Sequence, residues 1–299
     1  MNQIEELKNK IQKLVNQYNF GNYKLVIQEV NILLKKLPNN SFLLNLLGSC
    51  YQKLGDFDTA IKNFLQVLST EQKNLAAMNN LANAYKDILE FKKAENLYKE
   101  IINIDPNYIN AITNYANLKF QLDQYEDAIE LYNRALKIDD KIENIHYNMG
   151  LTYQSYGAFT EAEKHFKEML KINPTATIAD RLISRFTKYN QENTHFKEMV
   201  ERSRIDNLND NSKINLYFAL GKAYEDTKNY EKSFSFIKKA NDLTNNKFYY
   251  DRKDDDIFTE DIQKFFNKKD IINCANTKNT NKIIFIFGLP RSGTSLAEQ

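Results

Sequence analysis

The chain has 299 residues, of which 42% are hydrophobic and 27% charged, and its formal net charge is +2 at pH 7. This composition is typical of a folded protein with a large core, and a charge so close to zero gives no reason to expect nucleic acid as a partner. The two cysteines, Cys50 and Cys274, are too few and too far apart in sequence for a disulfide framework or a zinc site, so we expect free thiols and no bound metal.

The chain opens with a polar and acidic stretch, Met1–Glu6, which lacks the apolar segment of a secretory signal. No apolar run in the sequence approaches the roughly 18 residues that a membrane span needs. We therefore expect a cytoplasmic protein that does not contact a membrane.

Three of the four prolines indicate an internal repeat. Pro38, Pro106 and Pro174 are spaced by 68 residues each, which is twice 34. A period of 34 residues resembles the tetratricopeptide repeat, a helix–turn–helix unit that stacks into a superhelical α-solenoid. The resemblance predicts a mainly α-helical fold. The register holds without insertion for five repeats, which start near Leu7, Ser41, Leu75, Ile109 and Glu143.

Two kinds of position support this register. Mostly small residues recur at the eighth and twentieth positions, where the two helices of a hairpin must approach closely, and larger ones at the seventeenth and twenty-fourth, where we expect them to fill the space between hairpins. We expect a positive φ in the turn inside the hairpin, at Gly21, Gly55 and Gly157. The eighth position reads Leu14, Gly48, Ala82, Ala116 and Gly150, and the twenty-fourth reads Val30, Phe64, Tyr98, Tyr132 and Phe166.

The sixth repeat, from Thr177, lacks the small-residue pattern. We expect a first helix over Thr177–Tyr189 and a second, more polar helix over Thr194–Ile205, followed by a loop. The pattern returns in a seventh repeat, which starts near Ile214, 37 residues after the sixth, and ends near Asn245. The predicted array therefore occupies residues 1–245.

Residues 246–281 are interpreted as a connector that contains one helix. Asp254–Asp256 are predicted to cap this helix, which is expected to run to about Phe266 with its apolar residues on one side. An acidic triplet is also compatible with a metal site. Adjacent residues of a helix point in different directions, however, which favours a cap on a solvated face.

The sixth position is asparagine in three successive repeats, at Asn80, Asn114 and Asn148. This row resembles the asparagine ladder that lines the concave face of protein O-GlcNAc transferases. An asparagine side chain offers one acceptor and two donors, so the row implies a protein or peptide partner that is held through its backbone. The alternative is that asparagine is simply frequent in this chain, since the row does not extend into the neighbouring repeats.

A short apolar run, Ile283–Phe287, is interpreted as a buried strand, because it is rich in β-branched and aromatic residues and too short for a helix. Gly288 and Gly293 bracket a turn after it, and a helix can begin at Thr294. Such a strand, glycine loop and helix N-terminus bind phosphate in many proteins. The spacing matches a Walker A loop, but Thr294 stands where that loop has lysine, and Arg291 is the only cation in the turn.

The sequence from Pro290 to Ser295 resembles the 5′-phosphosulfate-binding loop of sulfotransferases, and most closely that of the protein-tyrosine branch. The resemblance implies sulfuryl transfer from 3′-phosphoadenosine 5′-phosphosulfate to an acceptor hydroxyl, on a protein tyrosine or a carbohydrate. Residues 282–299 are then the first strand, loop and helix of an α/β, P-loop-like sulfotransferase domain. Its catalytic base is expected beyond Gln299, so that the chain alone is inactive. The residues that the resemblance assigns to the co-substrate are Arg291, which also stabilises the transition state, Ser292, Gly293, Thr294 and Ser295.

Three functions are open at this point. The first is a sulfotransferase whose repeats present a protein or peptide acceptor, and the second is a scaffold without enzymatic activity, whose repeats bind partner proteins. The third, a P-loop kinase or ATPase, is disfavoured by Thr294 in the place of lysine. His146, His165 and His195 show no ligand or triad spacing, and we assign them no catalytic role.

Overall fold

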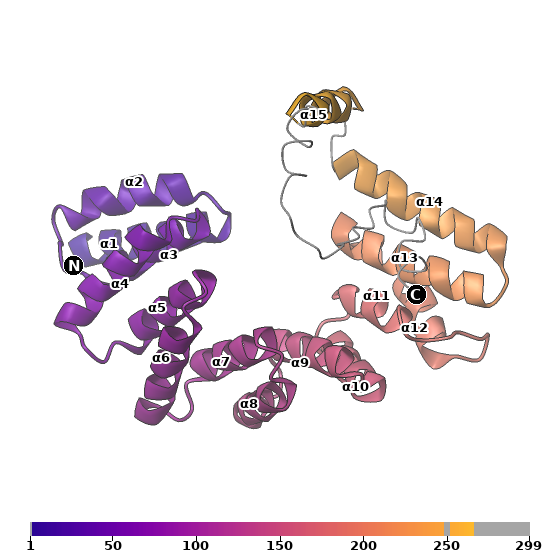
Figure 1. Ribbon diagram of the computed structural model, residues 1–299, viewed down its shortest axis with the longest axis horizontal. Coiled ribbons are helices and arrows are strands. Elements are labelled where there is room, and N and C mark those ends of the chain that lie inside the picture. The colour runs from indigo at the N-terminus through magenta and orange to yellow at the C-terminus, as the bar shows by residue number, and fades with distance from the viewer. Residues whose placement is uncertain (1, 248–251, 266–299) are drawn as a thin grey trace, which may run out of the picture. The chain divides into compact units, whose positions relative to one another are not determined.

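The structure, a computed structural model, describes residues 2–247 and 252–265, and every regular element in those two ranges is an α-helix (Figure 1). The helical solenoid expected from the repeat period is confirmed for this part of the chain. The predicted strand Ile283–Phe287 and the glycine loop after it lie outside the described residues. The chain divides into two compact units, Met1–Leu243 and Thr244–Gln299, and the first holds the repeats.

The first ten helices form five hairpins (Figure 1). The first residues of α3, α5, α7 and α9 are the residues predicted as repeat starts. The bounds are α1 (Asn2–Asn19) with α2 (Tyr23–Leu34), α3 (Ser41–Lys53) with α4 (Phe57–Thr70), α5 (Leu75–Asp87) with α6 (Phe91–Ile104), α7 (Ile109–Gln121) with α8 (Tyr125–Ile138), and α9 (Glu143–Tyr156) with α10 (Phe159–Ile172).

Each hairpin packs against the next one along the chain. In the second to fifth hairpins, the first helix contacts both its own second helix and the second helix of the preceding hairpin. In addition, α3 contacts α5, α5 contacts α7, and α7 contacts α9. The first helices of the second to fifth hairpins therefore form a continuous row, and residues that share a repeat position lie side by side along it.

The two helices of a hairpin approach most closely at the eighth position. A Cβ atom on Gly48 would lie 2.6 Å from Cε1 of Phe64, and one on Gly150 would lie 2.5 Å from Cε1 of Phe166. Both phenylalanines occupy the twenty-fourth position and are fully buried. The expected close approach is thus confirmed. The rings fill space within the hairpin as well as between hairpins, since Phe64 also shares a core cluster with Leu81 of the next one.

The turn inside each of the first five hairpins and inside the last one contains one residue in the left-handed backbone region. It is Gly21, Gly55 or Gly157 in three hairpins, with φ between +80° and +84°, as predicted. The equivalent residues elsewhere are Leu89 (φ 63°), Asp123 (φ 57°) and Lys228 (φ 61°). The turn therefore requires this conformation even where the sequence has no glycine.

The sixth hairpin differs from its prediction. Its first helix, α11 (Ile178–Ser184), ends at Ser184 and does not reach Tyr189, and its second helix is α12 (Thr194–Arg202). Side chains of α13 (Asp210–Asp226) bind the backbone that follows α11. Lys222 Nζ donates to the carbonyl oxygen of Thr187, and Asp226 Oδ2 accepts from the N–H of Tyr189 at 3.0 Å. These bonds replace the helical ones, which explains the early end of α11.

A buried polar cluster joins α11 to α12. Oδ1 of Asp180 lies 2.9 Å from Nε2 of His195 and accepts from Nη1 of Arg202 at 3.1 Å. Nδ1 of His195 lies 2.9 Å from the hydroxyl oxygen of Tyr189. Because Asp180 is 0% exposed, its carboxylate needs such partners to be tolerated inside the fold.

The last hairpin pairs α13 with α14 (Tyr230–Lys247), and α15 (Arg252–Phe265) follows. The predicted cap at Asp254–Asp256 is wrong, because α15 begins at Arg252 and these residues lie inside the helix near its start. Negative charge is favoured both at a cap and in the first turn, so the triplet signals a helix start without giving its first residue. In α15 the side chains of Ile257, Phe258 and Ile262 are exposed.

Candidate polypeptide-binding face

The three predicted asparagines lie at the same height on three neighbouring first helices. Asn80 is on α5, Asn114 on α7 and Asn148 on α9, and each side chain is half-buried. Because α5 contacts α7 and α7 contacts α9, the structure brings the three into one row. We call this row the asparagine face.

Hydrogen bonds between the helices fix two of these side chains. Nδ2 of Asn114 donates to Oδ1 of Asn79 on α5 at 3.0 Å, and Nδ2 of Asn148 donates to Oδ1 of Asn117 on α7 at 3.0 Å. Each amide thus uses one N–H to bind the preceding first helix. Among the described residues, the side chain of Asn80 makes no such bond.

Buried tyrosines orient the asparagines at the ninth position. The hydroxyl of Tyr98 donates to Oδ1 of Asn83 at 2.6 Å, and the hydroxyl of Tyr132 donates to Oδ1 of Asn117 at 2.5 Å. Sequence reasoning missed Asn83 and Asn117. A signal was present, since these asparagines occur in the two repeats whose twenty-fourth residue is tyrosine, whereas repeats with phenylalanine there, such as that of Phe64, have no asparagine at the ninth position.

The face offers hydrogen bonds without charge. Asn114 and Asn148 each keep one amide hydrogen and the carbonyl oxygen unused, and none of their atoms is among the buried side-chain atoms without a partner in the described part of the chain. The carbonyl oxygens of both residues are therefore open to solvent. One donor and one acceptor per residue is the pattern that the backbone of an extended chain complements.

Two of the histidines lie in contact. Nδ1 of His146 is 3.1 Å from Nδ1 of His165, and the ring of Tyr153 stacks on His165 with centroids 5.5 Å apart. Burial, together with the nearby His146, lowers the pKa of His165 to about 4. His165 is therefore neutral at pH 7 and packs as an aromatic ring.

The other candidate groups for chemistry are enclosed. His195 is 2% exposed, so that no substrate reaches its bonds to Asp180 and Tyr189. Cys50 is buried, and burial raises the pKa of its thiol to about 12, which keeps it protonated and unreactive. Across residues 2–247 and 252–265, no three His, Cys, Asp or Glu side chains come together as metal ligands, and no helix is long and apolar enough to cross a membrane. The predicted co-substrate residues Arg291–Ser295 lie outside the described residues.

Comparison with known families identifies the repeats. Tetratricopeptide-repeat family models match residues 40–107, 144–176 and 214–247, and a TPR-repeat model matches residues 116–157. An uncharacterized protein of Aquifex aeolicus (strain VF5) is 25% identical over 146 residues, which are 48% of this chain and 19% of that protein. The chain thus spans less than a fifth of the length of this relative.

Solved structures show the same fold. The C-terminal part of a TPR repeat-containing protein from Cytophaga hutchinsonii has a TM-score of 0.55 and 15% identity, and the match covers 78% of this chain and 94% of that one. A thermophilic TPR protein of Thermus thermophilus has a TM-score of 0.54 and 20% identity, with 57% of this chain and 94% of that one covered. At these identities the likeness establishes the fold alone.

Proposed function

Since the chain is a tetratricopeptide-repeat protein, and such repeats typically mediate protein–protein binding, we propose that it holds an extended polypeptide segment on the asparagine face. The observation that carries the proposal is the pair of bonds from Asn114 to Asn79 and from Asn148 to Asn117. They hold the amides in place before any partner arrives. Less side-chain entropy is therefore lost on binding.

The spacing of the helices sets a register for the bound segment. Packed helices lie about 8–10 Å apart, and an extended chain advances about 3.3 Å per residue. One asparagine therefore meets roughly every third residue of the segment. Because the bonds go to the backbone, we expect affinity to depend little on the side chains of the partner.

The test replaces the three asparagines by leucine, which is similar in size and cannot form hydrogen bonds. The probe is a fluorescein-labelled set of 12-residue peptides of varied sequence, measured by fluorescence anisotropy. We expect the Asn80→Leu/Asn114→Leu/Asn148→Leu protein to bind all members at least tenfold more weakly, which corresponds to about 1.4 kcal/mol. Equal affinity in the two proteins contradicts the proposal.

A matched control carries three substitutions of the same kind on second helices. Asn31, Asn103 and Asn133 are exposed residues of α2, α6 and α8. Changing these three to leucine adds the same apolar surface without touching the asparagine face. This protein is expected to bind as the unchanged chain does, so a general effect of exposed leucine is separated from loss of the face.

The sequence after the repeats supports a second proposal. In a longer protein, the loop with Arg291 binds 3′-phosphoadenosine 5′-phosphosulfate, and the repeats present the polypeptide whose hydroxyl receives the sulfuryl group. The support is the resemblance of Pro290–Ser295 to the sulfotransferase loop. Its glycines and hydroxyls suit an anion bound by backbone N–H groups.

Titration of 3′-phosphoadenosine 5′-phosphate into the full-length protein tests this second proposal. Saturable binding that Arg291→Ala weakens is the expected result, because Arg291 supplies the cation of the loop. Absence of binding, or binding that is indifferent to Arg291→Ala, removes the transferase and leaves the scaffold.

A further inference from the structure

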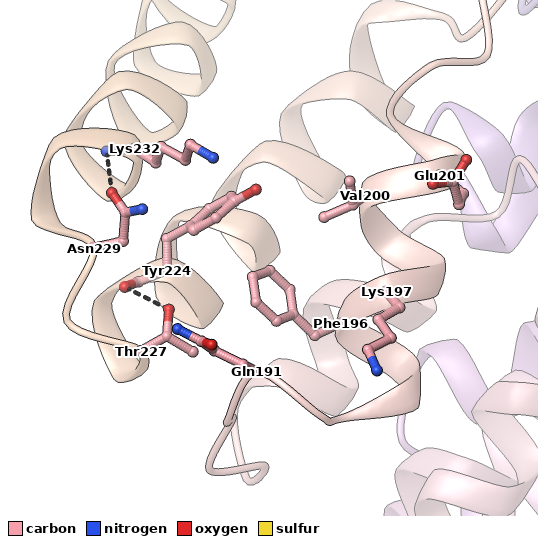
Figure 2. A pocket seen from close by; sticks show the side chains of 9 residues that line it. All are labelled: Gln191, Phe196, Lys197, Val200, Glu201, Tyr224, Thr227, Asn229 and Lys232. Carbon is pink, nitrogen blue, oxygen red and sulfur yellow. Dashed lines mark hydrogen bonds between the residues drawn. The ribbon is translucent and has the colours of Figure 1, made fainter.

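A pocket of about 350 Å³ opens between α12 and the ends of α13 and α14 that meet at the last hairpin turn (Figure 2). The helix on one side of it is short: α12 has nine residues, whereas α10 has fourteen. The volume is near the lower limit of roughly 300–1,000 Å³ for ligand sites, which suits one large side chain. None of its lining residues belongs to the asparagine face.

Aromatic rings form the inner wall of the pocket. Phe196 of α12 and Tyr224 of α13 face each other edge-on, with centroids 5.0 Å apart and an interplanar angle of 85° (Figure 2). Phe236 stacks on Tyr224 at 5.5 Å and 7°. Because Tyr224 packs against both phenylalanines, the wall is rigid, and Val200 extends it along α12.

The charge at the rim is uneven. Lys197 is paired with Glu192 at 2.9 Å, and Glu201 is paired with Arg204 at 2.9 Å. By contrast, the ammonium group of Lys232 lies 5.3 Å from the centroid of Tyr224 and has no carboxylate partner among the described residues. The N–H of the same residue donates to Oδ1 of Asn229, so the start of α14 is held in place. The pocket therefore carries an uncompensated positive charge beside an apolar wall.

We propose that this pocket binds a large apolar or aromatic side chain of a partner polypeptide, and that an aspartate or glutamate next to that side chain pairs with Lys232. The apolar wall selects the anchor residue, and the ammonium selects an acidic neighbour. The exposed amide of Gln191 at the rim can bind the backbone between them (Figure 2). This site goes beyond the proposed function, because its residues and its ligand are distinct from those of the asparagine face.

Three blocked, fluorescein-labelled pentapeptides test the assignment by anisotropy. They are Glu-Glu-Phe-Glu-Glu, Lys-Lys-Phe-Lys-Lys and Glu-Glu-Ala-Glu-Glu. We expect the first to bind at least tenfold more tightly than the other two. Lys232→Glu is expected to reverse the preference, so that the lysine peptide binds better than the glutamate peptide. Changes to the asparagine face leave both results intact, so failure here and failure of the proposed function are distinguishable.

Lys239→Glu is the matched control. Lys239 lies on the same helix and has its ammonium 5.4 Å from the centroid of Phe236, but it does not line the pocket. The control is expected to keep the preference of the unchanged protein. Equal effects of Lys239→Glu and Lys232→Glu show only a response to net charge and overturn the proposal.

Further outcomes also overturn it. Equal binding of the phenylalanine and alanine peptides removes the apolar anchor, and absence of binding of all three at 1 mM removes the site. Phenylpropionate is the competitor. If it displaces the first peptide and binds as tightly as that peptide, the pocket is a site for small aromatic acids and not for polypeptides.

Discussion

At the scale of single residues, the most telling positions are those whose backbone conformation does not suit their side chain. Leu89, Asp123 and Lys228 have φ near +60° in the turns where Gly21, Gly55 and Gly157 stand in other hairpins. The left-handed region costs a residue with a Cβ about 1–2 kcal/mol, and glycine avoids that cost. The packing of the two helices, not the turn residue, therefore determines the turn.

Leu89→Gly is expected to stabilise the protein by about 0.5–1 kcal/mol, since the relief of backbone strain exceeds the entropy that glycine loses on folding. Leu89 is 66% exposed, so little packing is lost. Gly157→Ala is the reverse experiment. A Cβ there meets no atom within 4 Å, so only the strain of the left-handed backbone changes, and the protein is expected to lose stability. Urea unfolding measures both; a lower midpoint for Leu89→Gly contradicts the interpretation.

A second residue-scale expectation concerns pH. Burial and the neighbouring His146 lower the pKa of His165 to about 4, whereas an unfolded histidine titrates near 6.5. Between these values the unfolded chain binds a proton that the folded chain does not. The stability is therefore complete above pH 6.5 and falls as pH drops towards 4. Allowing for the partial exposure of His165, the contribution is about 1–2 kcal/mol.

Replacing His165 by glutamine keeps a hydrogen-bonding side chain beside His146 and removes the titration. We expect the loss of stability between pH 7 and pH 4.5, measured from urea midpoints, to be smaller in His165→Gln than in the unchanged protein. The other acids and bases are common to both proteins and cancel in the comparison. An identical pH dependence rules out His165 as its source.

At the scale of the helical hairpin, the second to fifth hairpins use two solutions to close packing. Hairpins with phenylalanine at the twenty-fourth position have glycine at the eighth, as in Gly150 with Phe166, and the ring occupies the space of the missing Cβ. Hairpins with tyrosine there have alanine at the eighth and an asparagine that accepts the hydroxyl, as in Tyr132 with Asn117. Asn117 also accepts from Asn148 of the asparagine face, which links this packing to the proposed binding.

Gly150→Ala is expected to destabilise the protein by about 1–3 kcal/mol, because the new methyl group would lie 2.5 Å from the fully buried ring of Phe166. In the double variant with Phe166→Leu the penalty should be smaller than the sum of the single changes, since the smaller side chain makes room. Thermal or urea unfolding of the unchanged protein, the two single variants and the double variant measures these stability changes. Strict additivity indicates that the two residues do not compete for space.

The same scale shows where prediction from sequence succeeds. The hairpins α3–α4 to α9–α10 follow from positions that repeat every 34 residues, because each position has the same neighbours in every hairpin. The early end of α11 does not follow, since Lys222 and Asp226, which bind the backbone at Thr187 and Tyr189, are 35 and 37 residues away. No local pattern signals such a bond.

Prediction of the candidate site was partial for a related reason. The row of Asn80, Asn114 and Asn148 was found from its spacing, because a common repeat position implies a common face. The bonds that orient it, such as that from Asn148 to Asn117, join residues of different repeats and depend on side-chain geometry. The pocket beside Lys232 was not predicted, since its lining residues come from α12, α13 and α14 and no local pattern in the sequence brings them together.

At the scale of the whole molecule, the array presents one surface built from many similar units. The first helices α5, α7 and α9 each add one asparagine at a fixed interval, so that affinity for a partner accumulates along the row while each contact is weak. A partner held in this way is recognised by being extended and by its backbone. The proposed pocket between α12 and α14 adds the side-chain selectivity that the asparagine face lacks.

Recognition of the backbone is tested most directly by an ester scan. A 12-residue peptide that binds the protein is remade with one backbone amide at a time replaced by an ester, which removes a single N–H donor. We predict weaker binding, by a few-fold or more, at positions about three residues apart, and loss of this periodicity in the Asn80→Leu/Asn114→Leu/Asn148→Leu protein. Ester replacements without effect, in a peptide whose affinity instead follows its side chains, would contradict the binding mode proposed for these repeats.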